Sequence, residues 1–487
     1  MADAKDISTS LSDVSDRIAN LMGKGTADAA PASAEGKSAD ADKMADEPVA
    51  EGESVAGRKP TELRESSYQV MVTLADQQAD PNSPLFSAKT FEQLGLHEDL
   101  LKGIYAMKYQ KPSKIQERAL PLLLQNPPRN MIGQSQSGTG KTAAFVLTML
   151  SRIDYSVKKP QAIALAPSRE LARQTMDVVH EMGKFTPVTT AYAIPGAIER
   201  GDKVDAQLIV GTPGKLTELI KYKTLDTNHV KVFVLDEADN MLDQQGLGEQ
   251  SIRVKNMLPK SCQLVLFSAT FPDHVRDFAA RIAPSANEIR LRQEELSVEG
   301  IKQFYMDCKN EEHKYDVLVE LYSLLTIGQS IIFCGKRETA DQIAKRMTAE
   351  GHKTDSLHGK LEASARDRTI DDFRDGKIKV LIATNVISRG IDIQQVTLVI
   401  NYDMPLTQAN QPDAETYLHR IGRTGRFGRK GVSINFVHDK QSWEHMNAIE
   451  TLLKCNITRV STDDLEAMEK TIKDALKSAS SAPQVSV

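Results

Sequence analysis

Short apolar runs rich in Val, Ile and Leu recur along this chain, and each is followed by Gly, Ser, Thr or Pro and then by a helical pattern. Runs that are apolar on both faces and alternate with helices predict parallel β-strands in a sheet that helices cover on both sides. The first series consists of QAIALAPS from Gln161, AQLIVGTPG from Ala206, VKVFVLDEAD from Val230 and QLVLFSAT from Gln263.

The same pattern starts again after a charged stretch at residues 290–300. The second series consists of QSIIFCGK from Gln329, KTDSLHG from Lys353, KVLIATNV from Lys379, TLVINYD from Thr397 and GVSINFV from Gly431. We therefore predict two α/β domains that are joined by a short linker and separated by a cleft. Because ligands of open α/β sheets bind beyond the carboxyl ends of the strands, the polar residues that end these runs are candidate site residues.

The formal net charge of −5 belongs to one end of the 487-residue chain. Residues 1–60 contain 12 acidic and 7 basic residues and no Phe, Trp or Tyr, which predicts a solvated, disordered extension. The neutral remainder argues against nucleic-acid binding through bulk positive charge but leaves room for local basic patches. Four widely spaced cysteines without a Cys-x-x-Cys pair predict reduced thiols in a cytosolic or nuclear protein. The lack of a signal pattern or a long apolar run predicts a soluble protein without membrane insertion.

The segment SQSGTGKT follows a short apolar run and precedes a helical pattern. Its glycines allow backbone N–H groups to close on phosphate oxygens at a helix N-terminus. Lys141 can reach the β and γ phosphates, and the Thr142 hydroxyl can ligate Mg²⁺. A Gly-rich turn that only caps a helix is the alternative, and the first Gly of the usual pattern is Ser135 here. The candidate nucleotide-binding residues are Ser135, Gln136, Ser137, Gly138, Thr139, Gly140, Lys141 and Thr142.

The apolar strand VKVFVL ends in two acidic residues, Asp236 and Glu237. Asp236 suits Mg²⁺ coordination, and Glu237 suits orientation and deprotonation of an attacking water. An acidic pair at a strand end is by itself more often a helix cap or a solvated turn. Together with the phosphate loop, the pair favours a catalytic role.

The basic segment HRIGRTGRFGR, from His419 to Arg429, lies in the second domain. Arg423 and Arg426 are three residues apart and could share a helix face, which would aim two guanidinium groups at one phosphate. A solvated face or a phosphate-backbone patch is the alternative. Placement in the second domain favours arginines that act across the cleft and stabilise the charge of a transition state.

The ordered set of motifs resembles the DEAD-box RNA helicases of superfamily 2, from about Ser66 to about Leu476. The matching blocks are Phe91, YQKPSKIQ ending at Gln116, SQSGTGKT, PSRELA from Pro167, TPGK from Thr212, DEAD from Asp236, SAT from Ser268, SIIFC from Ser330, ATNVISRGID from Ala383 and HRIGRTGR from His419. The resemblance implies two tandem RecA-like parallel-sheet domains, with ATP and Mg²⁺ as cofactors and RNA-stimulated ATP hydrolysis as the activity. The implied segments are 1–65, a disordered acidic extension; 66–90, a family-specific flank; 91–293, the first RecA-like domain; 294–302, a linker; 303–478, the second RecA-like domain; and 479–487, a flexible C-terminus.

The resemblance also implies roles for individual residues. Phe91 and Gln116 would contact adenine, and Gly390 with Asp392 would meet the ribose. Ser268, Thr270 and His419 would couple the nucleotide site to RNA. The implied contacts to the RNA backbone are Arg169, Gly214, Thr384 and Arg366. Two segments depart from the family pattern, at 363–366 and at 195–197, and these departures bear on single RNA contacts and not on the nucleotide site.

The low aromatic content of 5% offers no stacking platform for reading bases. Backbone N–H groups with a few Arg, Ser and Thr side chains would hold sugar and phosphate, which predicts recognition of single-stranded RNA without sequence preference. A protein that binds 2′-hydroxyl groups should prefer RNA to DNA.

Two segments resemble the nuclear-pore-associated DEAD-box helicases of mRNA export: 66–96, which precedes the Q motif YQKPSKIQ, and LTQANQPDAE at 406–415. This resemblance implies remodelling of mRNA–protein complexes by a monomer at the cytoplasmic side of the nuclear pore complex, in a protein found in cytoplasm and nucleus. It also implies a cytoplasmic-face nucleoporin and an export mediator with inositol hexakisphosphate as partners. A general translation-initiation or ribosome-assembly helicase and a non-catalytic ATP-gated RNA clamp are the alternatives.

The extension holds one helical pattern, formed by Leu11, Val14, Ile18 and Leu21. This pattern could be a partner-binding helix, an export signal or an autoinhibitory segment, and a transient helix without a function is an equal alternative.

Overall fold

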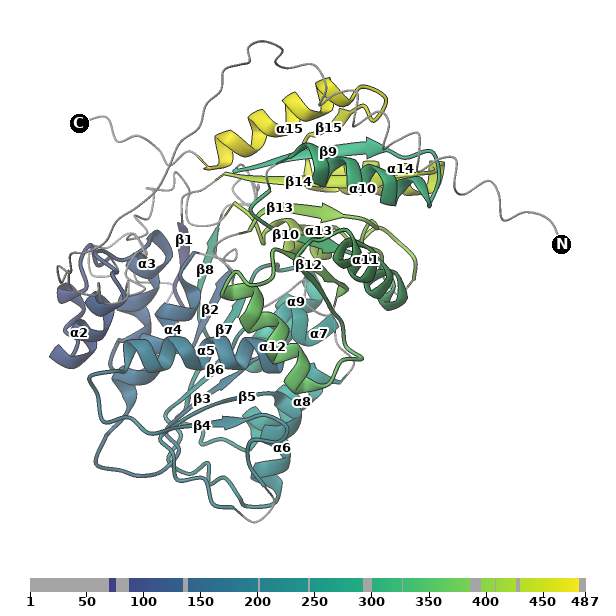
Figure 1. Cartoon of the computed structure of the whole chain (residues 1–487). Helices are drawn as coiled ribbons and strands as arrows, with labels where there is room; N and C mark the ends of the chain where they lie inside the picture. Colours follow the sequence, from purple (N-terminus) through teal and green to yellow (C-terminus); the bar gives the residue numbers. More distant parts are fainter. Residues whose placement is uncertain are drawn as a thin grey trace, which may run out of the picture. The chain divides into compact units, whose positions relative to one another are not determined.

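A computed structural model describes residues 70–75, 87–134, 139–199, 202–243, 246–291, 300–325, 327–385, 396–407, 409–425 and 430–480 (Figure 1). Several predictions lie outside these residues: the acidic extension with its helical pattern, most of the 66–90 flank, most of the linker and the last residues of the chain. None of the helices in the described ranges is both long and apolar enough to cross a lipid bilayer.

The first sheet has eight strands in the order β1-β8-β2-β7-β6-β3-β5-β4. The seven strands from β2 to β8 pair in parallel, and β1 pairs antiparallel with β8 at one edge. Their bounds are β1 (Val70–Thr73), β2 (Met131–Gln134), β3 (Ala162–Leu165), β4 (Thr190–Ala193), β5 (Leu208–Gly211), β6 (Val232–Leu235), β7 (Gln263–Ser268) and β8 (Asn287–Leu291).

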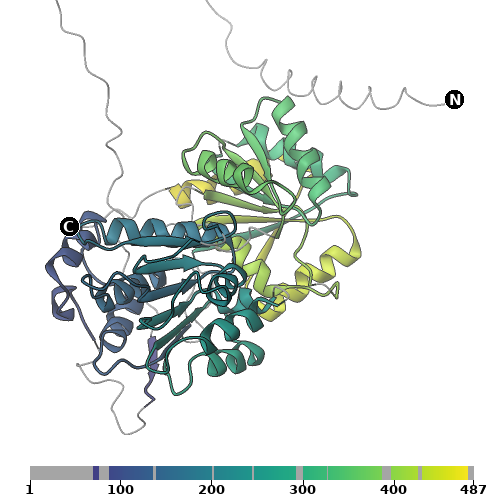
Figure 2. The same ribbon diagram turned by 90° about the horizontal axis from the view of Figure 1, so that it is seen from below.

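Two layers of helices cover the first sheet (Figure 2). One layer consists of α2 (Glu98–Ala106), α3 (Lys114–Leu123), α4 (Lys141–Arg152) and α5 (Arg169–Met182). The other consists of α6 (Pro213–Lys221), α7 (Ala238–Asp243), α8 (Leu247–Asn256) and α9 (Asp273–Ile282). Alternate residues of β3 join opposite layers, since Ala164 packs with the first and Ile163 with the second. A short 3₁₀ helix, η2 (Glu92–Leu94), precedes α2.

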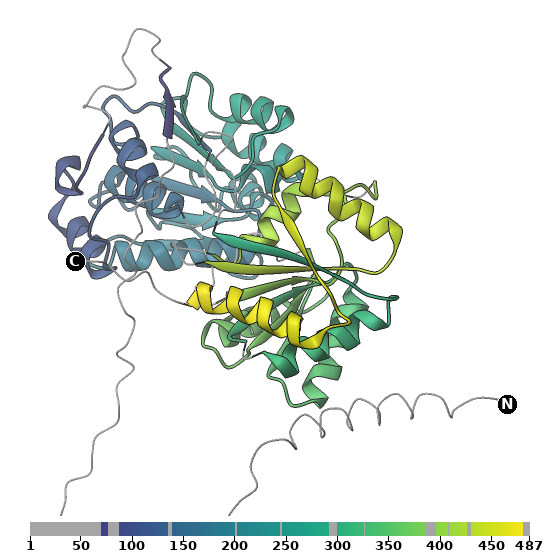
Figure 3. The same ribbon diagram turned by 90° about the horizontal axis from the view of Figure 1, so that it is seen from above.

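The second sheet has seven parallel strands in the order β11-β12-β10-β13-β14-β9-β15. Their bounds are β9 (Ile301–Asp307), β10 (Gln329–Phe333), β11 (Thr354–Leu357), β12 (Val380–Ala383), β13 (Val396–Asn401), β14 (Gly431–Val437) and β15 (Ile457–Val460). One face packs against α10 (His313–Leu324), α11 (Arg337–Ala349) and α15 (Leu465–Ser480). The other face packs against α12 (Ala363–Arg374), α13 (Ala414–Ile421) and α14 (Lys440–Leu453) (Figure 3).

The two sheets share one connectivity. Counted from the edge strands β4 and β11, the orders are β4-β5-β3-β6-β7-β2-β8 and β11-β12-β10-β13-β14-β9-β15. When the seven parallel strands of each sheet are numbered along the chain, both orders read 3-4-2-5-6-1-7. Each segment at the carboxyl edge of one sheet therefore has a counterpart in the other sheet.

The predicted fold class, two tandem parallel-sheet α/β domains, is confirmed. Each apolar run that we named corresponds to a strand. The edge strands β1, β4 and β15 and the inner strands β8 and β9 were not predicted. β4 and β15 carry partly exposed positions, so they lack the continuous apolar run that marks a central parallel strand. The flank before the first domain contributes β1 to the sheet of that domain.

Candidate active site

The phosphate-loop segment ends at Gly140, which has a left-handed φ of 99° and precedes α4. The backbone geometry favours glycine, and an ideal Cβ at this position would lie 2.5 Å from Gln116 Nε2, so the Gln116 amide would have to move. Lys141 is the first residue of α4 and is 9% exposed. Thr142 follows it on the helix, and 135–138 lie outside the described residues. The described half of the segment therefore brings a lysine and a hydroxyl to one helix N-terminus.

Gln116 links the first motif to the phosphate loop. It is the third residue of α3, where Ser113 and Gln116 form a reciprocal capping box. Gln116 Nε2 donates to the Gly140 carbonyl at 3.0 Å, and the Ser113 hydroxyl donates to the Thr139 carbonyl at 2.7 Å. Phe91 is buried and packs in the core cluster of the first domain. Adenine contacts of Phe91 and Gln116 remain predictions.

Asp236 and Glu237 directly follow β6, and both are buried. Burial raises the pKa of Asp236 to about 7, and the Lys141 ammonium opposes that rise. Glu237 has a left-handed φ of 51°, a strained conformation for a residue with a side chain, and its Oε2 accepts from Asn240 Nδ2 at 3.2 Å. Two buried carboxylates beside one ammonium form a site that suits a divalent cation.

The predicted coupling residues converge on Asp239, the last residue of the DEAD segment. The Ser268 hydroxyl accepts from the Asp239 N–H at 3.1 Å, and Thr270 donates to Asp239 Oδ2 through both its N–H and its hydroxyl, each at 3.0 Å. His419 Nε2 lies 3.7 Å from the same oxygen and has no hydrogen-bond partner among the described residues. The structure therefore brings all three residues to Asp239: Ser268 to its backbone N–H, and Thr270 and His419 to its carboxylate.

Arg423 does not lie on a helix face, which corrects the prediction that Arg423 and Arg426 share one. α13 ends at Ile421, and Gly422 and Gly425 interrupt the segment. Arg423 is buried in the turn that follows the helix, where its Nε donates to the His419 carbonyl at 3.0 Å. Arg426, Gly390 and Asp392 lie outside the described residues.

Two of the four candidate RNA contacts form ion pairs between α5 and α12. Arg169 lies 3.0 Å from Asp367, and Arg366 lies 3.4 Å from Glu170. Arg173, one turn after Arg169, contacts Asp367 at 2.9 Å and Asp371 at 3.2 Å. We call these residues the α5–α12 ladder: Arg169, Glu170, Arg173, Arg366, Asp367 and Asp371. An RNA phosphate that binds Arg169 or Arg366 has to compete with these carboxylates.

The other two candidate RNA contacts differ in exposure. Gly214 lies exposed near the start of α6, where a Cβ would come within 3.1 Å of the Gln250 side-chain oxygen. Thr384 follows β12 and is buried, and its hydroxyl has no hydrogen-bond partner among the described residues. A buried hydroxyl without a partner is available to a ligand that reaches it.

The chain matches known families over most of its described length. A model of the DEAD/DEAH box helicase matches residues 113–278, and a model of the helicase conserved C-terminal domain matches residues 313–428. The ATP-dependent RNA helicase DBP5 of Mycosarcoma maydis is 80% identical over 415 residues, which cover 85% of this chain and 91% of the relative. The chain belongs to the DEAD-box family of ATP-dependent RNA helicases.

This helicase is also similar in sequence and in fold to two solved structures. Dbp5 of S. cerevisiae bound to RNA and ADP BeF3 is 60% identical, with a TM-score of 0.77, and covers 80% of this chain and 100% of that chain. A Dbp5 variant bound to Nup159, a Gle1 variant, IP6 and ADP is 58% identical, with a TM-score of 0.60, and covers 79% of this chain and 100% of that chain. These similarities confirm the family and the RecA-like fold.

Several polar residues of the helicase site escaped the sequence analysis. Asp239 forms hydrogen bonds with Ser268 and Thr270, and the Ser113 hydroxyl donates a hydrogen bond to the phosphate loop. The Ser-x-x-Gln spacing of the capping box was a signal that could have indicated Ser113. Arg173 and Asp371 lie outside every motif. Their ion pair becomes evident only from the packing of α5 against α12.

Proposed function

We propose that this helicase remodels mRNA–protein complexes and drives mRNA export from the nucleus at the cytoplasmic face of the nuclear pore. The observation that carries the proposal is the similarity to Dbp5, for which solved complexes contain Nup159, Gle1 and IP6. The expected partners are a nucleoporin and an inositol-hexakisphosphate-dependent mediator. The enzyme would be found in cytoplasm and nucleus and would be enriched at the cytoplasmic side of the pore.

In the proposed reaction, Lys141 binds the β and γ phosphates of ATP, and Thr142 and Asp236 hold Mg²⁺. The buried acidic pair with its raised Asp236 pKa supports cation binding, because a cation would compensate the buried charge. Bound Mg²⁺ would neutralise charge on the phosphates. Glu237 would orient and deprotonate the attacking water.

The second domain would complete this site. Arg423 and Arg426 would stabilise the charge of the transition state, and Gly390 with Asp392 would bind the ribose. His419, which approaches Asp239, would transmit the state of the nucleotide site between the domains together with Ser268 and Thr270.

RNA binding would use Arg169, Gly214, Thr384 and Arg366. The ion pairs of Arg169 and Arg366 support a mechanism in which RNA phosphates take over from Asp367 and Glu170. Binding of ATP and RNA would then select a closed arrangement that bends a duplex or displaces a protein, and hydrolysis would reopen it.

The test compares ATPase rates with RNA, with DNA of the same sequence and without nucleic acid. We expect stimulation by RNA and little by DNA. Glu237→Gln should abolish RNA-stimulated hydrolysis and preserve ATP-dependent RNA binding, while Glu181→Gln on the exposed side of α5 should hydrolyse ATP normally. Turnover by Glu237→Gln would exclude Glu237 as the base.

Partner assays separate the export helicase from its alternatives. A general translation-initiation or ribosome-assembly helicase would share the ATPase results but would not bind a nucleoporin or respond to a mediator with inositol hexakisphosphate. A non-catalytic clamp would bind RNA with ATP and release no phosphate. Failure to bind the nucleoporin in a helicase with full RNA-stimulated activity would overturn the export role alone.

A further inference from the structure

The shared connectivity of the two sheets gives the phosphate-loop lysine a counterpart in the second domain. In each domain a helix follows the first parallel strand, and a lysine lies at its start: Lys141 is the first residue of α4, and Lys314 is the second residue of α10. In each domain an aspartate follows the fifth strand: Asp236 comes one residue after β6, and Asp403 comes two residues after β13. Lys314 and Asp403 therefore each lie within one residue of the position that corresponds to Lys141 or Asp236.

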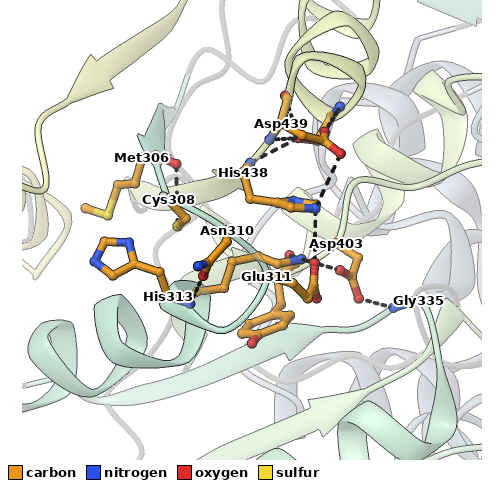
Figure 4. Close-up of polar contacts among 12 residues, drawn as sticks. Met306, Cys308, Asn310, Glu311, His313, Gly335, Asp403, His438 and Asp439 are labelled. Carbon is orange, nitrogen blue, oxygen red and sulfur yellow. Dashed lines mark hydrogen bonds and ion pairs between the residues drawn. The ribbon is translucent and has the colours of Figure 1, made fainter. Parts of the chain in front are cut away.

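In the second domain protein groups bind the lysine, and Figure 4 labels three residues of this cluster, Glu311, Asp403 and His438. Lys314 is 1% exposed, and its ammonium donates to Asp403 Oδ1 at 2.7 Å and to the Tyr402 carbonyl at 3.1 Å. Glu311 Oε2 lies 2.9 Å from the same nitrogen, and His438 lies 3.2 Å from that oxygen. Burial lowers the pKa of Lys314, but the carboxylates of Asp403 and Glu311 raise it by more, so the ammonium stays charged.

The loop before Lys314 lacks the residues that favour phosphate binding at its counterpart. Residues 308–312 read CKNEE, without glycine and with two glutamates, whereas the first domain has SQSGTG before Lys141. Glycines allow backbone N–H groups to approach phosphate oxygens, and glutamates repel them. The ammonium is thus paired with Asp403 and Glu311. The function of Lys314 therefore depends on the contacts that Asp403 makes.

Asp403 connects two segments of the second domain. Its Oδ2 accepts from the Gly335 N–H at 2.7 Å, and its backbone carbonyl accepts from the Arg420 guanidinium at 2.7 Å. Arg420 is fully buried in α13 and lies three residues before Arg423, the candidate transition-state arginine. The backbone carbonyl of Asp403 is therefore hydrogen-bonded to α13, the helix that precedes Arg423.

Gly335 lies in the loop between β10 and α11. By the shared connectivity of the two sheets, this loop corresponds to the loop between β3 and α5, which precedes the candidate RNA contact Arg169. Three residues join β10 to α11, whose first residue is Arg337, and three residues join β3 to α5, whose first residue is Arg169. Arg337 therefore corresponds to a candidate RNA contact, and it lies exposed. Asp403 bridges this loop and α13 through direct hydrogen bonds.

We propose that Lys314 and Asp403 are positioning residues that couple RNA binding to ATP hydrolysis in the second domain. Lys314 orients the Asp403 carboxylate, the carboxylate fixes the Gly335 N–H, and the loop before Arg337 keeps its register with α13. RNA bound at the loop is thereby connected to the segment that carries Arg423. The proposal rests on the RNA-stimulated ATPase and is independent of the role in export.

The test measures ATPase rate against the concentration of a single-stranded RNA oligonucleotide in the full-length protein. Asp403→Asn keeps the shape of the side chain but cannot pair with the ammonium in the same way. We expect the RNA concentration for half-maximal stimulation to rise about tenfold, as for the loss of a hydrogen bond between charged groups, with a much smaller change in the maximal rate. Amide hydrogen exchange at Gly335 should become faster in the same variant.

Tyr315→Phe provides the matched control on the same helix. Its hydroxyl donates to Glu350 at 3.0 Å and touches neither Asp403 nor Gly335. We expect this variant to lose some thermal stability and to keep its half-saturating RNA concentration. Lys314→Met should reproduce Asp403→Asn, and both are assayed below their unfolding transitions. An unchanged RNA requirement in Asp403→Asn, or an equal rise in Tyr315→Phe, would overturn the proposal.

Discussion

The side-chain amide of Gln116 donates a hydrogen bond to the Gly140 carbonyl at 3.0 Å. Its oxygen accepts from the Ser113 N–H at 2.9 Å, so one side chain joins the start of α3 to the last turn of the phosphate loop. Gln116 therefore has a structural task at the loop in addition to any contact with adenine.

Replacement of Gln116 by alanine should weaken ATP binding because the loop loses this support. We expect the ATP concentration for half-maximal hydrolysis to rise about tenfold, which corresponds to roughly 1.4 kcal/mol. Titration of ATP at saturating RNA measures the effect. Gln93→Ala is the control, because Gln93 accepts from Lys89 and does not reach the loop. An ATP requirement within twofold of the wild type would contradict a role of Gln116 at the loop.

Replacement of Gly140 by alanine should weaken nucleotide binding, because a side chain is strained at a φ of 99° and the new Cβ, 2.5 Å from Gln116 Nε2, would displace the Gln116 amide from the loop. Gly95→Ala separates this clash from backbone strain. Gly95 has a φ of 64° and open space where a Cβ would lie, so its substitution should cost about 1 kcal/mol of stability and leave ATP binding intact. Binding of a fluorescent ATP analogue to both variants distinguishes them. Equal loss of binding in the two variants would show that the effect of Gly140→Ala is not specific to the phosphate loop.

Reversal of charge in the α5–α12 ladder should reduce stimulation by RNA. Arg173 and Asp371 are 30% and 46% exposed, so their contact at 3.2 Å is worth about 1 kcal/mol or less. Arg173→Glu should repel Asp367 and Asp371 and lower the RNA-stimulated rate severalfold at low salt. Adding Asp371→Arg should restore part of the rate. The differences should shrink at about 0.3 M salt, where screening is strong. A double variant no faster than Arg173→Glu would argue against the pairing.

Three buried thiols should resist alkylation at pH 8. Burial raises the pKa of Cys262 and Cys308 to about 12 and also raises the pKa of Cys334. Since the folded pKa lies above the unfolded value of about 8.5, the folded state favours the neutral thiol. The stabilisation of the folded state by these neutral thiols is complete below about pH 8.5 and is lost as the pH rises toward 12.

Iodoacetamide labelling followed by peptide mass spectrometry measures this protection. Cys455 is only partly buried and should react first. All four cysteines should react in denaturant, so labelling of Cys262 reports unfolding of the first domain. Rapid modification of Cys262 in the native protein would contradict its burial.

Most of the central strands and the order of the motifs could be predicted from the sequence, because parallel strands buried on both faces have a continuous apolar composition. β4 and β15 escaped because edge strands are partly exposed. The sequence indicated Lys141, Asp236 and Glu237, since each follows a strand at the ligand-binding edge.

Contacts between distant segments could not be predicted in the same way. The convergence of Ser268, Thr270 and His419 on Asp239 and the pairing of Arg173 with Asp371 depend on how helices and strands pack. The helical spacing of Arg423 and Arg426 was misleading because α13 ends at Ile421, before Arg423. Periodicity alone does not show where a helix stops.

The seven parallel strands of each sheet come from one unbroken stretch of chain, 131–291 for the first sheet and 301–460 for the second. Among the strands that the structure describes, no strand of one sheet pairs with a strand of the other sheet. We therefore expect that each half folds when it is produced separately, and that a reconstituted mixture hydrolyses ATP only when nucleotide and RNA bring the halves together. In such a split enzyme, the dependence of the rate on the concentration of one half would measure directly how strongly the ligands join the domains.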